Sequence, residues 1–533
     1  MKRLRPAFGV LAALALAALA LSGCGTTVGG TTAASNTTAA GTTSGNALSV
    51  PSTGAGTGNT PGATGGVNSS SAAGSGQAII PGHGGSASTT GGTTGSGATG
   101  STGGSAAPQT GIGITPTKIY VGVTYSSGAD EANKALGNNI TSGDQQADGQ
   151  AVIDDINAHG GVAGRKLVPV WYDYQTTDAR PYTNIDGEAC AKFTQDNKVF
   201  AVAGDGLTDN FAACVTHAGA LMVSTATTII GPDQAYFEKY PYTFSVGYLT
   251  QDRMMAEEVR SLLRQDYFSG WNTATGNPAN AVPAKVGILS FDTPHWSDPL
   301  HHVMLPALAR AGHPVDSTNV QEVAYPQGTN GIGSTIAQIQ SAVLKFRQNG
   351  ITHVIILDGN GSMTLYALNN MRGQHYYPRL GVNSATGVEV LATQYHSDAQ
   401  SFNGAVGLGW GPQLDLPQGQ GDKYSTPHTK ACIKMVEKRT GQQFPDTNSA
   451  SIALGYCDEL YLIADAINGA GAVVDRDAAA VAIEALRGTF PASGTYGVFF
   501  SPTRHDGIEY GYDLKFDLGC TCTKYTRGPF RIP

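Results

Sequence analysis

Residues 148–172 read DGQAVIDDINAHGGVAGRKLVPVWY, and this stretch carries the pattern that decides the fold. Val152, Ile153 and Ile156 fall on one face of a predicted helix, which Gly160 and Gly161 end. The apolar run 167–172 that follows predicts a strand. A helix followed by an apolar strand is the repeating unit of α/β proteins with a parallel sheet.

The same alternation extends on both sides of this stretch. Strands are predicted at 118–124, 199–203 and 221–223, and helices around 185–195 and 209–218. Because the strands are almost entirely apolar, we expect a parallel, doubly wound sheet with helices on both faces.

A second set of strands and helices begins after Pro283. In chain order its predicted elements are 285–290, 300–311, 320–324, 335–349, 353–357, 363–372 and 380–382. The short run 242–246 lies between the two sets and suits a strand that crosses between them. The sequence therefore predicts an α/β protein with two similar domains.

Residues 155–167, DINAHGGVAGRKL, resemble a segment of the type I periplasmic binding proteins of the Leu/Ile/Val-binding kind. The resemblance extends to a cysteine pair like Cys190 and Cys214, to the strand end 222–224 and to the run 352–356. It implies two doubly wound, Rossmann-like lobes that are joined by three crossover strands and close on a small molecule in the cleft between them.

Three crossovers make each lobe discontinuous in sequence. We expect lobe 1 to comprise 113–242 and 410–500, and lobe 2 to comprise 243–409 and 501–533. The resemblance also implies a partner, because the ligand-bound receptor of an importer docks on the permease subunits of an ABC transporter. A sensory or regulatory receptor, or a surface interaction protein of the same fold, is the alternative, and the sequence does not separate them.

The first residues have the features of a bacterial lipoprotein signal peptide. A basic start precedes the apolar run 7–20, and the tetrapeptide LSGC then ends at Cys24. The run is shorter than the roughly 20 residues that a membrane span needs. We expect removal of 1–23, acylation of Cys24 and an extracytoplasmic protein attached to the outer face of the cytoplasmic membrane. An uncleaved anchor helix is the alternative.

Residues 24–112 are predicted to form a disordered tether. Gly, Ser and Thr supply 56 of the 88 residues from 25 to 112, and Lys, Arg, Asp and Glu are absent from them. Such a stretch cannot build a core. A flexible chain of this length has a root-mean-square span of about 50 Å, enough for the folded part to rotate and reach.

Apart from Cys24 the chain has six cysteines, an even number that favours disulfides in an oxidising compartment. Sequence neighbours suggest the pairs Cys190–Cys214 and Cys432–Cys457. Cys520 and Cys522 could close a tight ring or make longer links. A metal site is disfavoured, because the chain has no C-x-x-C and no histidine pair at ligand spacing near the cysteines.

Ligands of open α/β sheets bind beyond the carboxyl ends of the strands. Two loops there, 204–210 and 224–228, offer hydroxyls and free N–H groups that suit a carboxylate. The resemblance assigns ligand contact to four of their residues, Thr208, Ala226, Thr227 and Thr228. The alternative is that the Ser and Thr residues only cap helices and form turns.

Five further residues at strand ends are candidates for ligand contact: Tyr125, His295, Trp296, Asp358 and Asn383. Tyr125 could instead pack within its loop, and His295 and Trp296 could be structural. In amino-acid binders of the resembled family a carboxylate stands where Asn383 is found, and it pairs with the ammonium of the ligand. An amide cannot supply that charge. Unless Asp205, Asp292 or Asp358 does so, a carboxylate without an amine, an amide or another small polar metabolite remains open as the ligand.

Other functional classes find little support. The chain has 32 Lys and Arg against 40 Asp and Glu, whereas nucleic-acid-binding proteins show a basic patch. The enzyme motifs G-x-S-x-G, H-E-x-x-H and G-x-x-x-x-G-K-[ST] are absent from the folded part. His301 and His302 are adjacent, a spacing that does not bring two ligands to one metal on a helix. We therefore expect no enzyme activity, no metal and no cofactor.

Overall fold

The structure is a computed structural model that describes residues 111–131, 143–225, 230–395 and 397–533. The predicted signal peptide, Cys24 and the predicted tether as far as residue 110 lie outside the described residues.

The first lobe is built on a five-stranded parallel sheet. Its strands are β1 (Lys118–Tyr125), β2 (Lys166–Asp173), β3 (Ala201–Ala203), β4 (Leu221–Ser224) and β5 (Thr243–Ser245). Their spatial order is β2-β1-β3-β4-β5, an order found in doubly wound α/β folds. The parallel, doubly wound sheet predicted from the alternating apolar runs is confirmed.

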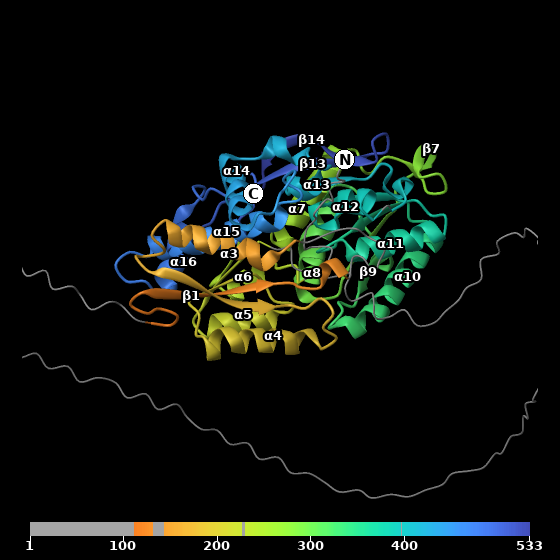
Figure 1. Cartoon of the computed structure of the whole chain (residues 1–533). Coiled ribbons are helices and arrows are strands. Elements are labelled where there is room, and N and C mark those ends of the chain that lie inside the picture. The colour runs from red at the N-terminus through yellow and green to blue at the C-terminus, as the bar shows by residue number, and fades with distance from the viewer. Residues whose placement is uncertain (1–110, 132–142, 226–229, 396) are drawn as a thin grey trace, which may run out of the picture. The chain divides into compact units, whose positions relative to one another are not determined.

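Helices cover both faces of this sheet (Figure 1). One face packs on α4 (Tyr182–Ala191), which a π-helical turn extends to Asp196, on α5 (Asp209–His217) and on α6 (Gln234–Lys239). The other face packs on α3 (Gln145–Ala158) and on three helices from late in the chain, α14 (Pro427–Thr440), α15 (Ser451–Gly469) and α16 (Arg476–Leu486). The late segment thus completes the first lobe.

The central strand β1 shows why its residues suit this position. Val121 and Val123 are fully buried on the α3 side. On the opposite side Gly122 leaves room for Phe193, whose ring would lie only 2.8 Å from a Cβ atom added at Gly122. The small residue therefore lets an aromatic ring pack directly on the backbone of the sheet.

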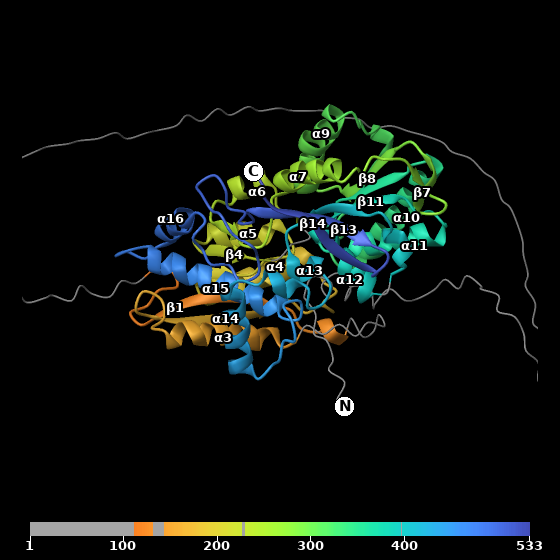
Figure 2. The ribbon, with the colours of Figure 1, turned by 90° about the horizontal axis from the view of Figure 1, so that it is seen from above.

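The second lobe contains a seven-stranded sheet in the order β14-β13-β12-β11-β10-β8-β9. Five strands are parallel: β8 (Val286–Phe291), β9 (Val320–Val323), β10 (His353–Ile356), β11 (Arg379–Asn383) and β12 (Val406–Gly409). The antiparallel strands β13 (Tyr510–Asp517) and β14 (Cys522–Arg531) extend one edge, as Figure 2 shows.

The helices of this lobe are α7 (Gln251–Arg264), α8 (Pro294–Pro299), α9 (Leu305–Arg310), α10 (Ile332–Gln348), α11 (Ser362–Gly373), α12 (Val388–Thr393) and α13 (Pro412–Asp415). A short hairpin pairs β6 (Trp271–Asn272) with β7 (Asn277–Val282). The helix predicted at 300–311 consists of a π-helical segment, Leu300–Met304, followed by α9. Prolines at positions 299 and 306 lack the N–H that a continuous α-helix needs there.

The chain crosses between the lobes three times, after β5, after β12 and after α16. The first and third crossovers lie side by side. Ser245 N donates to His505 O over 2.9 Å, and Gly507 N donates to Ser245 O over 2.6 Å. Backbone hydrogen bonds therefore join two of the three connections.

Three disulfides join cysteines of the described residues. Cys190–Cys214 joins α4 to α5, Cys432–Cys457 joins α14 to α15, and Cys520–Cys522 closes the turn between β13 and β14. The pairs suggested by sequence proximity are confirmed, and of the two alternatives for Cys520 and Cys522 the structure shows the tight ring.

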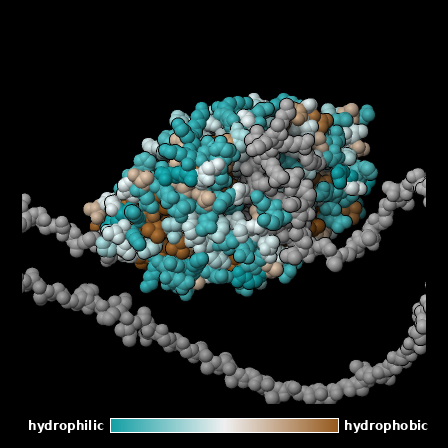
Figure 3. Space-filling view, in the orientation of Figure 1, coloured by the Kyte–Doolittle hydropathy of each residue, from teal (hydrophilic) through white to brown (hydrophobic). Residues whose placement is uncertain are grey.

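The surface of the described part is largely polar. Figure 3 shows a face on which hydrophilic residues predominate. The large apolar side chains that stay exposed come from separate elements, for example Leu344 of α10 and Val481 of α16. Among the described helices, none is both long and apolar enough to cross a membrane.

The disulfides differ in the length of chain that they close, which predicts different contributions to stability. Cys432 and Cys457 are 25 positions apart, and Cys520 and Cys522 only 2. Loss of the first bond, in a Cys432→Ala/Cys457→Ala variant, should lower the free energy of unfolding by about 3 kcal/mol, because the unfolded chain gains the freedom of a long loop.

The matched control is the Cys520→Ala/Cys522→Ala variant. Its free energy of unfolding should fall clearly less, because the loop that this bond closes is short. Urea unfolding followed by circular dichroism measures both. Equal losses would contradict an effect that acts through the unfolded chain.

Candidate functional site

A cavity of about 230 Å³ lies between the two lobes. The first lobe contributes residues at the carboxyl ends of β1, β3 and β4, and the second contributes residues that follow β10, β11 and β12. The carboxyl ends of strands from both sheets thus meet at one site, as expected for ligand sites in open α/β sheets. The first turns of α15 complete the wall.

Buried contacts with Thr124 and Asp186 hold the loop after β3 in place. Gly204 has a φ of +114°, and a Cβ atom there would lie 1.9 Å from Thr124 Oγ1, so only glycine fits. The buried carboxylate of Asp186 accepts hydrogen bonds from Leu207 N (2.9 Å) and Thr208 N (2.7 Å). These contacts fix the position of Asp205, which lines the cavity.

Three carboxyl groups line the cavity: Asp205, Asp458 and Glu459. Burial raises the pKa of Asp205 to about 7, that of Asp458 to about 7 and that of Glu459 to about 8. Glu459 Oε1 accepts from Thr225 N (2.8 Å) and Thr225 Oγ1 (2.9 Å), and Asp458 Oδ2 accepts from Gly494 N (2.9 Å). Ser224 donates to Asp205, whose Oδ2 atom nevertheless has no partner.

Four polar atoms at the cavity wall are enclosed and have no hydrogen-bond partner in the structure. They are Gln145 Nε2, Asp205 Oδ2, Ser451 Oγ and Thr495 Oγ1. Gln145 is 4% exposed and Thr495 8% exposed. An enclosed polar atom without a partner costs about 1–3 kcal/mol, so a hydrogen bond from a ligand or water that reached these atoms would offset that cost.

Aromatic rings form much of the remaining wall. Tyr174 donates its hydroxyl to Asp186 (3.0 Å), and Tyr456 donates its hydroxyl to Thr124 O (3.0 Å). Their hydroxyls are thus used within the protein, and ring atoms are left to face the cavity. Tyr125 and the nearly buried Trp410 add two further rings.

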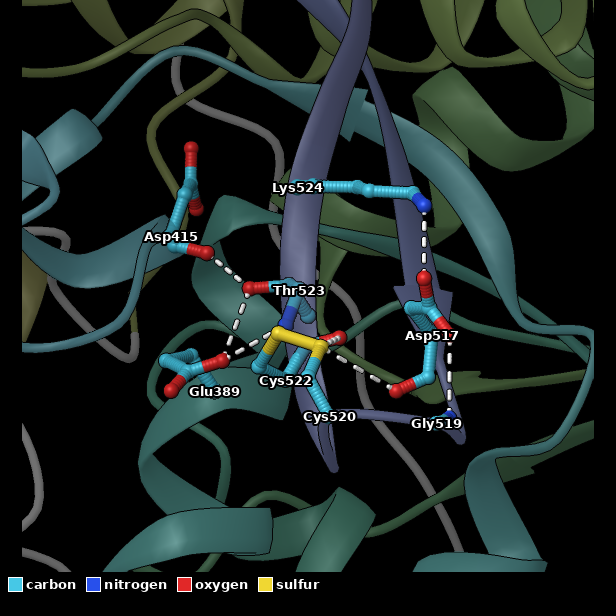
Figure 4. The surroundings of a disulfide bond; sticks show 8 residues. All are labelled: Glu389, Asp415, Asp517, Gly519, Cys520, Cys522, Thr523 and Lys524. Carbon is cyan, nitrogen blue, oxygen red and sulfur yellow. Dashed lines mark hydrogen bonds and ion pairs between the residues drawn. A yellow bond between two sulfur atoms is a disulfide. The ribbon is translucent and has the colours of Figure 1, made fainter.

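On the second lobe the cavity wall is braced from the β13–β14 hairpin. Ser384 Oγ accepts from Trp410 N and donates to Asp415 Oδ2, both over 2.7 Å. Thr523, next to the Cys520–Cys522 disulfide, donates its hydroxyl to Asp415 O and its backbone N–H to Glu389 Oε2 (Figure 4). Tyr525 also donates to Asp415 Oδ2, over 2.6 Å. The hairpin therefore helps to hold Ser384 and Trp410 at the cavity.

Of the residues predicted to contact ligand, Tyr125 lies at the cavity wall. Thr208 does not line it: its hydroxyl donates to Asp186 and accepts from Asn210 N at the start of α5. This is the helix-capping role that the sequence offered as the alternative. Ala226, Thr227 and Thr228 lie outside the described residues.

Asp358 and Asn383 are fully buried beside the cavity and do not line it. Asp358 Oδ2 accepts from Thr364 N (2.8 Å), and Asn383 Nδ2 donates to Glu258 Oε2 (3.0 Å). Instead, Asn360 and Ser384 line the cavity wall. They follow Asp358 by two positions and Asn383 by one. Ligand contact by Asp358 and Asn383 stays a prediction without support from this geometry.

His295 and Trp296 lie between the lobes and outside the cavity wall. Trp296 is fully buried, and its ring packs on Gly231, in the segment between β4 and α6. His295, on α8, contacts Asp209 of α5 and Asp233 at the start of α6, each over 2.8 Å. The two residues therefore tie the second lobe to the first at one side of the cleft.

Sequence reasoning did not identify Gln145, Trp410, Ser451, Tyr456 or Thr495. Ser451 and Tyr456 belong to the start of α15, which reaches the cavity through the long return of the chain. No local motif marks such positions. Within the described ranges, no group of His, Cys, Asp and Glu residues is arranged to hold a metal ion.

The ion pairs of His295 predict a pH-dependent link between the lobes. Burial alone would lower the pKa of His295, but the hydrogen bonds and charges of Asp209 and Asp233 outweigh it and raise the pKa to about 9. The stabilisation is fully present below pH 6.5, the ordinary pKa of histidine, and is lost as the pH rises through 9.

His295→Gln should therefore lower the free energy of unfolding by roughly 2 kcal/mol at pH 6, and by little above pH 9. Denaturant unfolding at pH 6, 8 and 10 measures the difference. The exposed His302, on the same stretch, supplies the control variant His302→Gln. A loss that is the same at all three pH values would contradict the ion-pair account.

Comparison with known proteins gives a family and a set of structures with the same fold. A family model described as "Periplasmic binding protein" matches residues 137–512. A search of curated protein sequences finds no match.

Solved structures share the fold at low sequence identity. A solute-binding protein of an ABC transporter from R. palustris, in complex with 4-hydroxybenzoate, has a TM-score of 0.54 at 15% identity over 78% of this chain and 98% of that one. A branched-chain amino acid transporter substrate-binding protein from Streptococcus pneumoniae, in complex with isoleucine, has a TM-score of 0.51 at 14% identity over 78% and 100%. A fatty acid ABC transporter substrate-binding protein from Thermomonospora curvata has a TM-score of 0.52 at 15% identity over 79% and 94%.

Proposed function

The chain belongs to the periplasmic binding protein family, and we propose that it captures a small polar solute in the interlobe cavity and delivers it to an ABC importer. The family is one of solute-binding proteins rather than enzymes. The solved structures of the same fold carry names that refer to an amino acid, a hydroxybenzoate and fatty acids, so the fold alone leaves the ligand open.

The observation that carries the proposal is the cavity between the lobes. It is lined from both lobes and contains four enclosed polar atoms without a protein partner. A ligand placed there would contact both lobes at once and satisfy these atoms. Since such contacts exist only when the lobes are together, the ligand would bind the closed form more tightly and shift the population toward it.

Closure of the lobes would carry the signal to the importer. The contacts of His295 and Trp296 join the lobes on one side of the cleft, and the crossovers join them through the chain. Ligand binding would then set how the two outer surfaces lie relative to each other. A permease that docks on both lobes would distinguish loaded from empty receptor by that difference.

The sequence before the folded part supports a location at the membrane surface. The LSGC tetrapeptide that ends at Cys24 suits cleavage and acylation, and the long Gly/Ser/Thr stretch suits a flexible tether. Acylation at Cys24 would keep the receptor near its permease. The pairing of six cysteines into three disulfides fits an oxidising compartment outside the cytoplasm.

A variant that fills the cavity tests the proposal. Ser451→Phe places a large side chain at the start of α15, where Ser451 lines the cavity and its hydroxyl has no partner. It should abolish the rise in melting temperature that a bound solute gives the unaltered protein, measured over a screen of amino acids, amines, carboxylates, amides and sugars.

Ser341→Phe, at an exposed position of α10, is the matched control and should keep the response. The proposal fails if no solute in the screen raises the melting temperature of the unaltered protein after unfolding and refolding have removed any bound molecule. It also fails if Ser451→Phe, folded to the same degree as the control, keeps the full response.

A further inference from the structure

We propose that the ligand is a small organic cation, an amine without a carboxylate, whose ammonium group binds Asp205. The inference rests on the proposed function, since it assigns a chemical class to the solute of the same cavity. Such an amine differs from an amino acid and from a simple carboxylate, two ligand classes that the sequence left open.

The charges of the cavity wall point to a cation. Asp205, Asp458 and Glu459 line it, and none of the described residues around it is Lys, Arg or His. Asp186 and Asp148, both buried, lie behind the wall next to Tyr174 and Tyr456. A carboxylate on the ligand would lie next to these acidic groups without a positive partner, which is costly in a buried site.

Asp205 has the fewest protein donors of the three carboxyl groups, because only the Ser224 side chain donates a hydrogen bond to it. Asp458 and Glu459 receive hydrogen bonds from backbone N–H groups of Ser493, Gly494 and Thr225. The Oδ2 atom of Asp205 is enclosed and has no partner. An ammonium group is a strong donor of the opposite charge, so it would satisfy this atom and lower the cost of its burial.

Other groups at the wall suit the remainder of such a molecule. The rings of Tyr125, Tyr174, Tyr456 and Trp410 offer apolar surface and can interact with a cation through their π faces. The enclosed Nε2 of Gln145 is a donor, and it suits one neutral acceptor such as a hydroxyl or an amide oxygen. A cavity of about 230 Å³ holds a small molecule of this kind.

The N-terminus of α15 favours an anion, but its partial positive charge is too small to outweigh the carboxyl groups. The N-terminus of α15 faces the cavity through Ser451 and Ile452, and no side chain caps it. A helix N-terminus acts as roughly half a positive charge. A bound cation favours the ionised form of the carboxyl groups. The negative charge of the three groups then exceeds the half positive charge of the helix N-terminus.

The pH dependence of binding follows from the same groups. Burial raises the pKa of Asp205 to about 7, and Asp186 adds to the effect, while Ser224 opposes it. Glu459, Tyr236 and Tyr248 also interact with Asp205. Because the ammonium binds the ionised carboxylate, affinity for an amine should rise between pH 6 and pH 8, with release of protons on binding.

The test uses the full chain with its disulfides intact, freed of bound solute by unfolding and refolding. Isothermal titration calorimetry is run with pairs of probes that share a body and differ in charge: 2-phenylethylamine against 3-phenylpropionate, and pentylamine against hexanoate. Phenylalanine and norleucine represent zwitterions, and 3-phenylpropanamide represents neutral solutes. We expect the amines to bind, more tightly at pH 8 than at pH 6, and the acids not to bind.

Asp205→Asn should weaken amine binding at least about tenfold, because it removes the buried counter-charge. Asp298→Asn, at an exposed carboxylate on α8, should leave the affinity unchanged. The pH series on the unaltered chain provides a second readout if Asp205→Asn does not fold.

Binding of acids, zwitterions or neutral solutes in preference to amines would overturn the inference and leave the solute-receptor function standing. Amine affinity that is unchanged by pH and by Asp205→Asn would overturn the assignment of the ammonium to Asp205. Absence of binding by every solute, in these pairs and in the wider screen, would instead overturn the proposed function itself.

Discussion

The packing of α15 on the first sheet is the contact on which the rest of the site depends. This helix buries twelve of its nineteen residues and covers the face that α3 leaves open. Glu459 accepts a hydrogen bond from the backbone N–H of Thr225 at the end of β4. Tyr456 donates its hydroxyl to the backbone carbonyl of Thr124 at the end of β1. One helix thus completes a hydrophobic core and at the same time places polar groups at the ends of two strands.

The sequence was sufficient to predict the fold because its local patterns agree with its global arrangement. The apolar runs around β1, β8 and β10 favour buried parallel strands, and glycines end the intervening helices where the chain must turn. The ends of most elements fall within a few residues of the predicted ones. The π-helical segments are the main departure, and prolines near residue 300 account for one of them.

The site was predicted less completely than the fold, for physical reasons. The rule that ligands bind at strand ends predicted a site at the edge of the sheets where the cavity lies, and Tyr125 lines that cavity. It could not tell which side chain at a strand end faces the cavity and which is used within the protein. Asp358 and Thr208 cap helices, while Asn360 faces the cavity. Residues of α15 carry no signal of their own, since their place depends on a contact across more than two hundred positions of the sequence.

The interleaving of the lobes has a consequence for the order in which the protein can fold. During synthesis the strands of the first sheet leave the ribosome long before α14, α15 and α16 exist. Until then one face of that sheet, with Val121, Val123 and Val223, has only α3 to cover it. The bond between Cys190 and Cys214 needs only the first half of the chain, whereas that between Cys432 and Cys457 needs nearly all of it. A chain without α14, α15 and α16 therefore exposes an apolar surface of the first sheet, and the first lobe cannot complete its core until these late helices have emerged.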